Sequence, residues 1–199
     1  AAFSEKHRHL VSGLGRADSL ICDAHKMMHV PALCAFVFYK QAKHRFAAFQ
    51  QDAPYLFDPS SPGMADFDCG LMTMECTKRA ASFGLWGVWS TYGPGVFADL
   101  VDATFGLADE AWQMIQSQSD FDAPYRPQCN ILVYRYVPPG ADINRANDMN
   151  REIRRRLIES GDFYVSQTTI AGVALLRMTV INPLTTMETI SDLIGKIRH

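Results

Sequence analysis

The order of apolar and polar positions predicts a chain that mixes strands and helices. Short apolar runs predict a buried strand at 19–22 and a second strand at 32–39. Apolar residues at helical spacing predict helices at 71–92 and 96–116, separated by a Gly-Pro-Gly segment. We expect the large side chains of both helices to form core: Met74, Ala81, Leu85, Trp86, Trp89, Phe97, Leu100, Val101, Phe105, Ala108, Trp112 and Ile115.

The rest of the chain contains a further strand, a helix, two strands and a final helix. These elements are expected, in order, at 131–134, 143–157, 163–168, 173–181 and from Thr186 onwards. The order is typical of a small α/β layer, and no internal repeat is visible. We therefore predict an α/β protein with one domain at 1–118 and a smaller α/β domain at 119–199.

Composition and charge exclude several classes of partner. The chain has 199 residues and a formal net charge of -2, so it offers no basic surplus for nucleic acid or an anionic membrane. Its apolar runs are shorter than the roughly 18 residues of a membrane-spanning helix. The five cysteines are odd in number and form no CxxC pair, which is typical of reduced thiols in a cytoplasmic protein and gives no zinc-site spacing.

The segment Asp23-Ala24-His25-Lys26 follows the first apolar strand directly. A lysine nucleophile must lose its proton before it can attack an aldehyde. Partial burial among Met27, Met28 and Val30 would disfavour the ammonium form and free the amine. From these residues alone, Lys26 is either such a nucleophile or an ordinary surface lysine.

Arginines occur in two contrasting settings. Arg177 lies within the apolar strand predicted at 173–181, where an unpaired guanidinium would be costly to bury, so it needs an anion. Arg151, Arg154, Arg155 and Arg156 lie on the polar side of the helix predicted at 143–157, where they indicate a solvated face. Between 50 and 68, Asp, Pro, Ser and Gly predict a surface loop.

Several of these segments, in this order, resemble the C-terminal half of the group II pyridoxal-phosphate-dependent amino-acid decarboxylases. This family includes the glutamate, cysteine-sulfinate, diaminobutyrate and aromatic-amino-acid decarboxylases. The matching motifs are Arg16-Ala17-Asp18-Ser19, Asp23-Ala24-His25-Lys26-Met27-Met28, Glu75-Cys76-Thr77-Lys78-Arg79, Pro127-Gln128-Cys129-Asn130-Ile131, and Leu176-Arg177-Met178 leading into Asn182-Pro183. The resemblance implies the PLP-dependent transferase fold type I, with the C-terminal part of the large domain followed by the small domain.

The resemblance also implies roles for individual residues. Lys26 would hold pyridoxal 5'-phosphate covalently, and His25 and Asp23 would orient the cofactor and its phosphate. Thr77 would reach the partner's phosphate across a homodimer interface, although an ordinary position in the first turn of a helix is the alternative. Arg177 would bind the substrate carboxylate, with a structural ion pair as the alternative. The implied reaction converts an amino acid to its amine and CO2, with no metal.

Two departures from the family pattern change these expectations. The aspartate that pairs with the pyridine nitrogen and the histidine that stacks on the ring would both precede Ala1. We therefore expect activity to need an N-terminal half, in the same or a separate chain. The loop tyrosine that protonates the substrate carbon in many relatives would fall near Gly63 or Met64, and no tyrosine lies between Leu56 and Thr91. Slow protonation would favour oxidative deamination or transamination as side reactions.

The substrate and the reaction class stay open at this point. Methionine follows Lys26, whereas the aromatic-amino-acid branch usually has tryptophan there, so the sequence favours a small polar or acidic amino acid. The alternatives are another fold type I enzyme, such as an aminotransferase or a lyase, and a non-catalytic remnant or interaction module.

Overall fold

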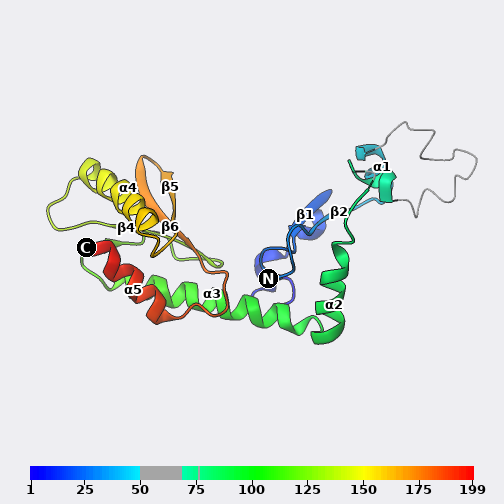
Figure 1. Ribbon diagram of the computed structural model, residues 1–199, viewed down its shortest axis with the longest axis horizontal. Helices are drawn as coiled ribbons and strands as arrows, with labels where there is room; N and C mark the ends of the chain where they lie inside the picture. The colour runs from blue at the N-terminus through cyan, green and yellow to red at the C-terminus, as the bar shows by residue number, and fades with distance from the viewer. Residues whose placement is uncertain (50–68, 76) are drawn as a thin grey trace, which may run out of the picture. The chain divides into compact units, whose positions relative to one another are not determined.

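A computed structural model describes residues 1–49, 69–75 and 77–199 of the chain. The chain divides into two compact units, Ala1–Phe97 and Ala98–His199, and the division falls inside helix α3, Gly95–Gln116 (Figure 1). The sequence-based domain boundary after residue 118 lies at the other end of this helix and stays a prediction. Each unit is described separately.

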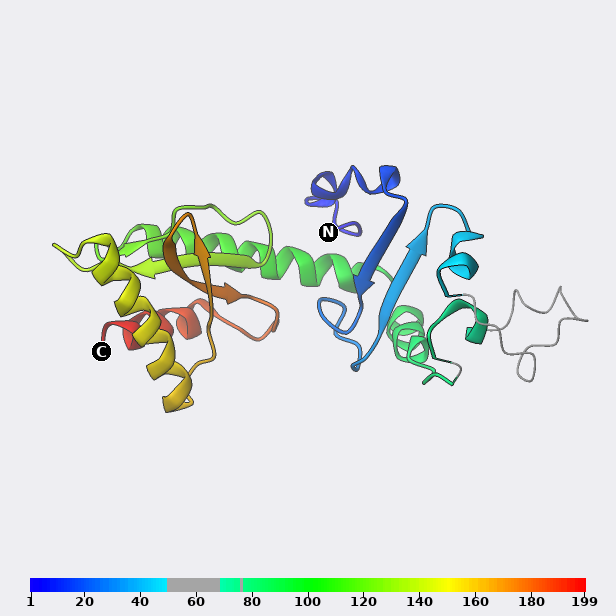
Figure 2. The ribbon, with the colours of Figure 1, turned by 90° about the horizontal axis from the view of Figure 1, so that it is seen from above.

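The first unit is built around a two-stranded antiparallel hairpin (Figure 2). Strand β1, Ser19–Asp23, pairs with β2, Ala35–Tyr39, in a register from Ser19↔Tyr39 to Asp23↔Ala35. Both predicted strands are confirmed, but the prediction of a buried first strand is wrong. Ile21 is 68% exposed, and its partner across the hairpin, Val37, is 47% exposed.

Short helices complete this unit. They are the 3-10 turns η1, Arg8–Val11, η2, Leu14–Arg16, and η4, Cys69–Met72, and the α-helices α1, His44–Phe49, and α2, Ser82–Tyr92. The predicted helix at 71–92 is therefore wrong in its first half.

The side chains predicted as the apolar face of that helix do not form a common core. Met74 is 82% exposed, and Trp86 stacks on Phe83 on the exposed side of α2, with ring centroids 5.4 Å apart. Ala81 and Leu85 of the predicted set do pack, together with Val88, against the buried turn of the hairpin. The prediction is wrong for Met74, which precedes α2, and for Trp86, because α2 is apolar nearly all round and its pattern does not single out one buried stripe.

The second unit is a four-stranded antiparallel sheet packed against helices. Its elements are the remainder of α3, β3, Phe121–Asp122, β4, Ile131–Tyr136, α4, Ile143–Ser160, β5, Ser166–Ile170, β6, Val173–Thr179, and α5, Met187–Arg198. The strand order is β3-β4-β6-β5, so β6 is an interior strand. The predicted strand, helix, strand, strand, helix order is confirmed, and only the short β3 was missed.

One core joins the sheet to α3, α4 and α5. Its fully buried side chains include Leu132 and Tyr134 of β4 and Leu176 of β6, with Ile115, Ile190 and Ile197 from the helices. Successive side chains of a strand point to opposite faces of the sheet. Arg177, next to Leu176, therefore points to the face opposite this core.

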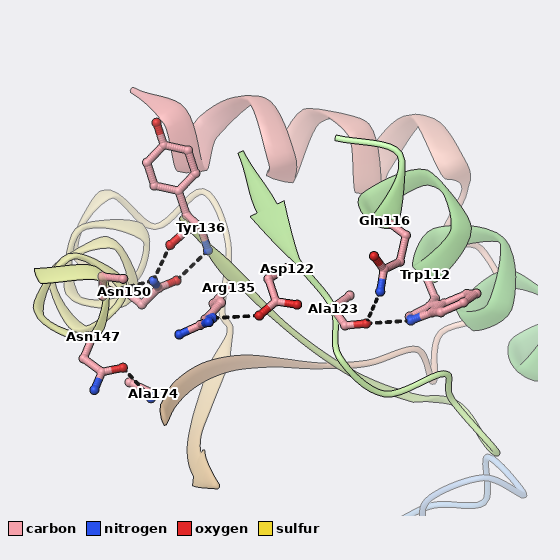
Figure 3. Close-up of polar contacts among 10 residues, drawn as sticks. Trp112, Gln116, Asp122, Ala123, Arg135, Tyr136, Asn147, Asn150 and Ala174 are labelled. Carbon is pink, nitrogen blue, oxygen red and sulfur yellow. Dashed lines mark hydrogen bonds and ion pairs between the residues drawn. The ribbon is translucent and has the colours of Figure 1, made fainter. Parts of the chain in front are cut away.

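Two asparagines of α4 hold the sheet by its backbone (Figure 3). Asn150 accepts a hydrogen bond from the Tyr136 amide, at 2.9 Å, and donates one to the carbonyl of the same residue, at 2.8 Å. Asn147 donates to the Gly172 carbonyl and accepts from the Ala174 amide, both at 2.8 Å. Because each side-chain amide satisfies two backbone groups, α4 fixes both β4 and the start of β6.

The predicted solvated arginine face of α4 is confirmed for Arg151 and Arg155, which are exposed, whereas Arg154 and Arg156 are half-buried. Arg151 pairs with Asp148 at 2.8 Å, and Arg155 pairs with Glu152 and Glu159 along the exposed side of the helix. Arg156 instead donates to the last carbonyls of α5, those of Lys196 and Ile197. In the described ranges, no helix combines the length and apolar character that crossing a bilayer requires.

Candidate functional site

The turn after β1 brings three of the predicted site residues together. Strand β1 ends at Asp23, and the chain then folds back, with the Lys26 amide donating to the Asp23 carbonyl at 3.2 Å. The turn buries Ala24 and Val30 against Cys34, while Lys26 lies on its outside. Asp23, His25 and Lys26 thus share one end of the hairpin.

Lys26 is paired instead of buried. Its Nζ lies 2.5 Å from Asp23 Oδ2, and its side chain is 62% exposed. The prediction that burial among the neighbouring methionines would free the amine is therefore wrong, since the turn inserts its small residues into the core. The hydrogen bond from Lys26 lowers the pKa of Asp23, an effect that partial desolvation opposes, so this carboxylate stays ionised at neutral pH.

The imidazole of His25 is held by the backbone at Cys34. His25 Nδ1 lies 2.7 Å from the Cys34 carbonyl oxygen, and the His25 amide donates to the same oxygen at 3.1 Å. The Cys34 amide nitrogen also lies 3.2 Å from Nδ1, so the backbone of Cys34 contacts this ring nitrogen through both its carbonyl and its amide. With Nδ1 held there, Nε2 is the ring nitrogen that can contact another group. No pattern in the sequence indicates this contact, because it joins residues from the two sides of the turn.

Thr77 lies in the segment between η4 and α2 and is exposed. It precedes the first residue of α2 by five positions, so the alternative of a first-turn helical position is wrong. Its neighbour Lys78 lies 3.7 Å from Glu75. Within the described residues, no hydrogen bond or ion pair joins Thr77 to Lys26. The predicted loop at 50–68, with the position expected for the tyrosine, lies outside the described residues.

Arg177 lies in the second unit, in the interior strand β6. It is half-buried, and Nη1 lies 3.5 Å from Ser166 Oγ on β5. Across residues 1–49, 69–75 and 77–199, no carboxylate lies within ion-pair distance of its guanidinium. The structural ion pair proposed as the alternative is thus not found in this part of the chain, and the guanidinium can bind an external anion.

The side-chain groups of Lys26, His25 and Asp23 are of the kinds that bind an aldehyde cofactor. An exposed primary amine is the group that an aldehyde requires, and Lys26 provides it at the edge of the hairpin. Hydrogen-bonding groups of His25 and Asp23 lie beside it. Lys26, His25 and Asp23 would therefore hold pyridoxal phosphate at this turn, provided that the Lys26–Asp23 pair opens.

An exposed lysine just after a strand in an α/β fold is compatible with an enzyme that attaches an aldehyde cofactor. Comparison with known proteins is more specific, since the pyridoxal-dependent decarboxylase conserved domain matches residues 1–137. The chain belongs to the pyridoxal-dependent decarboxylase family.

Individual relatives agree with this assignment. An L-aspartate decarboxylase from Metarhizium robertsii is 31% identical over 154 residues, which cover 76% of this chain and 30% of the relative. An aromatic-L-amino-acid decarboxylase from Bacillus atrophaeus is 24% identical over all 199 residues, or 42% of its own length. The chain thus spans less than half the length of both relatives.

The fold is shared with solved structures. The structure of Oryza sativa TDC with PLP and tryptamine matches with a TM-score of 0.87 at 21% identity, covering 98% of this chain and 41% of that protein. This similarity confirms the predicted α/β class and fold type I.

Proposed function

We propose that this chain forms the lysine-bearing part of a decarboxylase that converts an L-amino acid to its amine and CO2. The observation that carries the proposal is the grouping of Lys26, His25 and Asp23 at one end of the hairpin, in a chain of the pyridoxal-dependent decarboxylase family. When bound, pyridoxal phosphate supplies an electron-withdrawing ring for the electron pair that the departing CO2 leaves behind.

Each residue of the turn has a separate task in this proposal. Lys26 attaches the cofactor aldehyde after its amine has lost a proton, and Asp23 is the counter-ion that must release it. His25 presents Nε2 to the cofactor or its phosphate, because Nδ1 is held by the Cys34 carbonyl. Both neighbours thereby orient the group that Lys26 binds.

Thr77 is proposed to contact the cofactor phosphate of a second copy of the chain. Its exposed position and the lack of a described contact with Lys26 are compatible with a role across a homodimer interface. The aromatic side chains of Phe83 and Trp86 lie nearby in sequence on the exposed side of α2, where a second copy would bury them. The active site would then lie at the interface.

Arg177 is proposed to bind the carboxylate of the substrate. A guanidinium recognises a carboxylate through two parallel hydrogen bonds, which fixes the orientation of the group that leaves as CO2. The lack of a carboxylate partner within the described residues supports this assignment. In the assembled enzyme, Arg177 and Lys26 would have to lie close enough to contact the same substrate molecule.

The substrate is proposed to be a small polar or acidic amino acid. The L-aspartate decarboxylase among the relatives supports an acidic substrate, as does the methionine that follows Lys26. Because the chain spans 30% and 42% of the two relatives, we propose that activity needs the remaining part of the family's length, in the same or a separate polypeptide. The unpaired cysteine pattern supports a cytoplasmic location.

Release of labelled CO2 tests this function. The chain, alone and with a polypeptide that supplies the rest of the family's length, is incubated with pyridoxal phosphate and carboxyl-labelled aspartate, glutamate or tryptophan. We expect release from an acidic substrate in the combined preparation, loss of it in Lys26→Ala, and no loss in Lys40→Ala, which removes another exposed lysine. An oxo acid formed without labelled CO2 would identify an aminotransferase instead.

A further inference from the structure

Ser166 and Arg177 are direct cross-strand partners. They occupy paired positions of β5 and β6, while Val133 of β4 pairs with Arg177 on its other side. Side chains at paired positions of antiparallel strands lie on the same face of the sheet. Arg177 is therefore flanked by a hydroxyl on one side and by an apolar side chain on the other.

The hydroxyl of Ser166 is arranged to accept a hydrogen bond from Arg177. Ser166 Oγ donates its proton to the carbonyl oxygen of Arg177 at 3.0 Å. A serine hydroxyl has one proton and two lone pairs, so only acceptor capacity is left. Nη1 of Arg177 lies 3.5 Å from this oxygen and uses that capacity. The two bonds together restrain the side chain of Arg177 against its own strand.

The remaining N–H groups of the Arg177 guanidinium are available to bind a ligand. In the described part of the chain, Nε and Nη2 of Arg177 make no hydrogen bond, so the edge that they form can bind a carboxylate side-on. Arg135 on the neighbouring strand is different, because its Nε lies 3.0 Å from Asp122 Oδ2. Arg135 is therefore paired with a carboxylate, whereas the contact of Arg177 among the described residues is with an uncharged hydroxyl.

We propose that Ser166 is a positioning residue that holds Arg177 for the carboxylate of the substrate. This inference rests on the proposed function, in which Arg177 binds that carboxylate. A neutral acceptor orients the guanidinium without competing for it, whereas an aspartate at this position would occupy the edge that the substrate needs. The two hydrogen bonds of Asn147 with the Gly172 carbonyl and the Ala174 amide hold the β5–β6 hairpin in place. They thereby keep Ser166 and Arg177 in register.

Three substitutions separate positioning from a general structural role. Ser166→Ala removes the acceptor, and Ser166→Thr keeps a hydroxyl in a strand that already contains threonines. Thr168→Val is the matched control, because Thr168 lies two residues along on the same face and pairs with Leu175. Arg177→Lys removes the planar two-pronged donor and assigns the Arg177 signals in 15N NMR spectra.

Two readouts test the proposal. In the combined preparation, we expect Ser166→Ala to raise KM roughly three- to tenfold with kcat within about twofold, since Arg177 loses the hydrogen bond that orients it for the substrate carboxylate. In the 199-residue chain, the same variant should speed rotation of the Arg177 guanidinium, measured by 15N NMR. Ser166→Thr should restore both values, and Thr168→Val should change neither.

A failure of the positioning role of Ser166 can be distinguished from a failure of the proposed function of Arg177. Wild-type KM and wild-type guanidinium rotation in Ser166→Ala would overturn the positioning role, as would equal losses of melting temperature and kcat in Ser166→Ala and Thr168→Val. If Arg177→Lys retains wild-type KM, the proposed function of Arg177 fails, whatever Ser166 does. If Arg177→Lys raises KM and Ser166→Ala does not, only the role of Ser166 fails.

Discussion

The Nζ of Lys26 lies 2.5 Å from the carboxylate oxygen Oδ2 of Asp23, three residues earlier in the same turn. Because of this contact, Asp23 would do more than orient a cofactor. A carboxylate so close holds Nζ in a hydrogen-bonded ion pair, so that the amine is not free to attack an aldehyde. Cofactor attachment at Lys26 therefore requires that the ion pair first be broken.

Replacement of Asp23 by asparagine should make Lys26 more reactive. Without the carboxylate, Nζ is no longer held in the ion pair. We expect reductive labelling of Lys26 by a small aldehyde at pH 7 to be roughly two- to fivefold faster, a modest change because exposed ion pairs are weak. Peptide mapping by mass spectrometry measures the rate at each lysine.

Asp162→Asn is the matched control for this labelling. Asp162 pairs with Lys196 at 3.2 Å, also on the surface, so the control should speed labelling at Lys196 and leave Lys26 unchanged. Equal rates of Lys26 labelling in wild type and Asp23→Asn would mean that the ion pair does not control the reactivity of the Lys26 amine.

The homodimer proposal predicts complementation between inactive subunits. If Thr77 acts across the interface, a Lys26→Ala chain and a Thr77→Val chain each lack a different half of the site. Mixing them should restore about a quarter of wild-type activity, because random pairing makes half of the dimers mixed, and each mixed dimer holds one intact site. Activity that stays at the level of the separate variants would place Thr77 and Lys26 in the same subunit or Thr77 outside the site.

Tyr134 predicts a stabilising substitution in the second unit. Its side chain is fully buried, its hydroxyl has no hydrogen-bond partner among the described residues, and burial raises the pKa of the phenol. Tyr134→Phe removes an unsatisfied polar group and should raise the free energy of unfolding by about 1 kcal/mol. Tyr136→Phe, on the same face and only half-buried, should change it by less than about 0.5 kcal/mol in urea denaturation. A destabilised Tyr134→Phe would show that the hydroxyl is bound in solution.

The pair between Asp120 and Arg198 predicts a pH-dependent contribution to stability. Two hydrogen bonds from Arg198, both 2.7 Å long, lower the pKa of Asp120, and partial desolvation opposes the shift. A lowered folded-state pKa means that the stabilisation is complete above the ordinary value of 3.8 and is lost as the pH falls through the folded value.

Asp120→Asn should therefore lower the free energy of unfolding by about 1 kcal/mol at pH 7, with the difference from wild type closing in acid. Asp162→Asn, whose carboxylate and Lys196 partner are each nearly half exposed, should have a smaller effect. A difference for Asp120→Asn that is constant from pH 7 to pH 3 would show that the ionised carboxylate is not its source.

Much of the second unit could be predicted from sequence because its patterns are local. Helix α4 has an apolar stripe, and its N-cap is a side chain, Asp142, that accepts from the Arg145 amide. Helix α5 begins in the same way after Thr186. In contrast, α2 is apolar on several sides, so its buried stripe depends on which neighbours pack against it.

The site was predicted in part for the same reason. The motif around Lys26 and the apolar surroundings of Arg177 are visible in the sequence, because each is local to one strand or turn. The Cys34 contact of His25 and the pairing of Ser166 with Arg177 join residues on different sides of a turn or on different strands. The exposure of Lys26 depends on which residues of its turn enter the core. No periodicity reports such contacts.

Covalent mapping of the cofactor tests the central claim most directly. The combined preparation is incubated with pyridoxal phosphate, reduced with borohydride, digested and analysed by mass spectrometry. The account predicts the pyridoxyl mass on Lys26, with Lys40 and Lys78 unmodified. A cofactor bound without modification of Lys26, or equal modification of all three lysines, would contradict it.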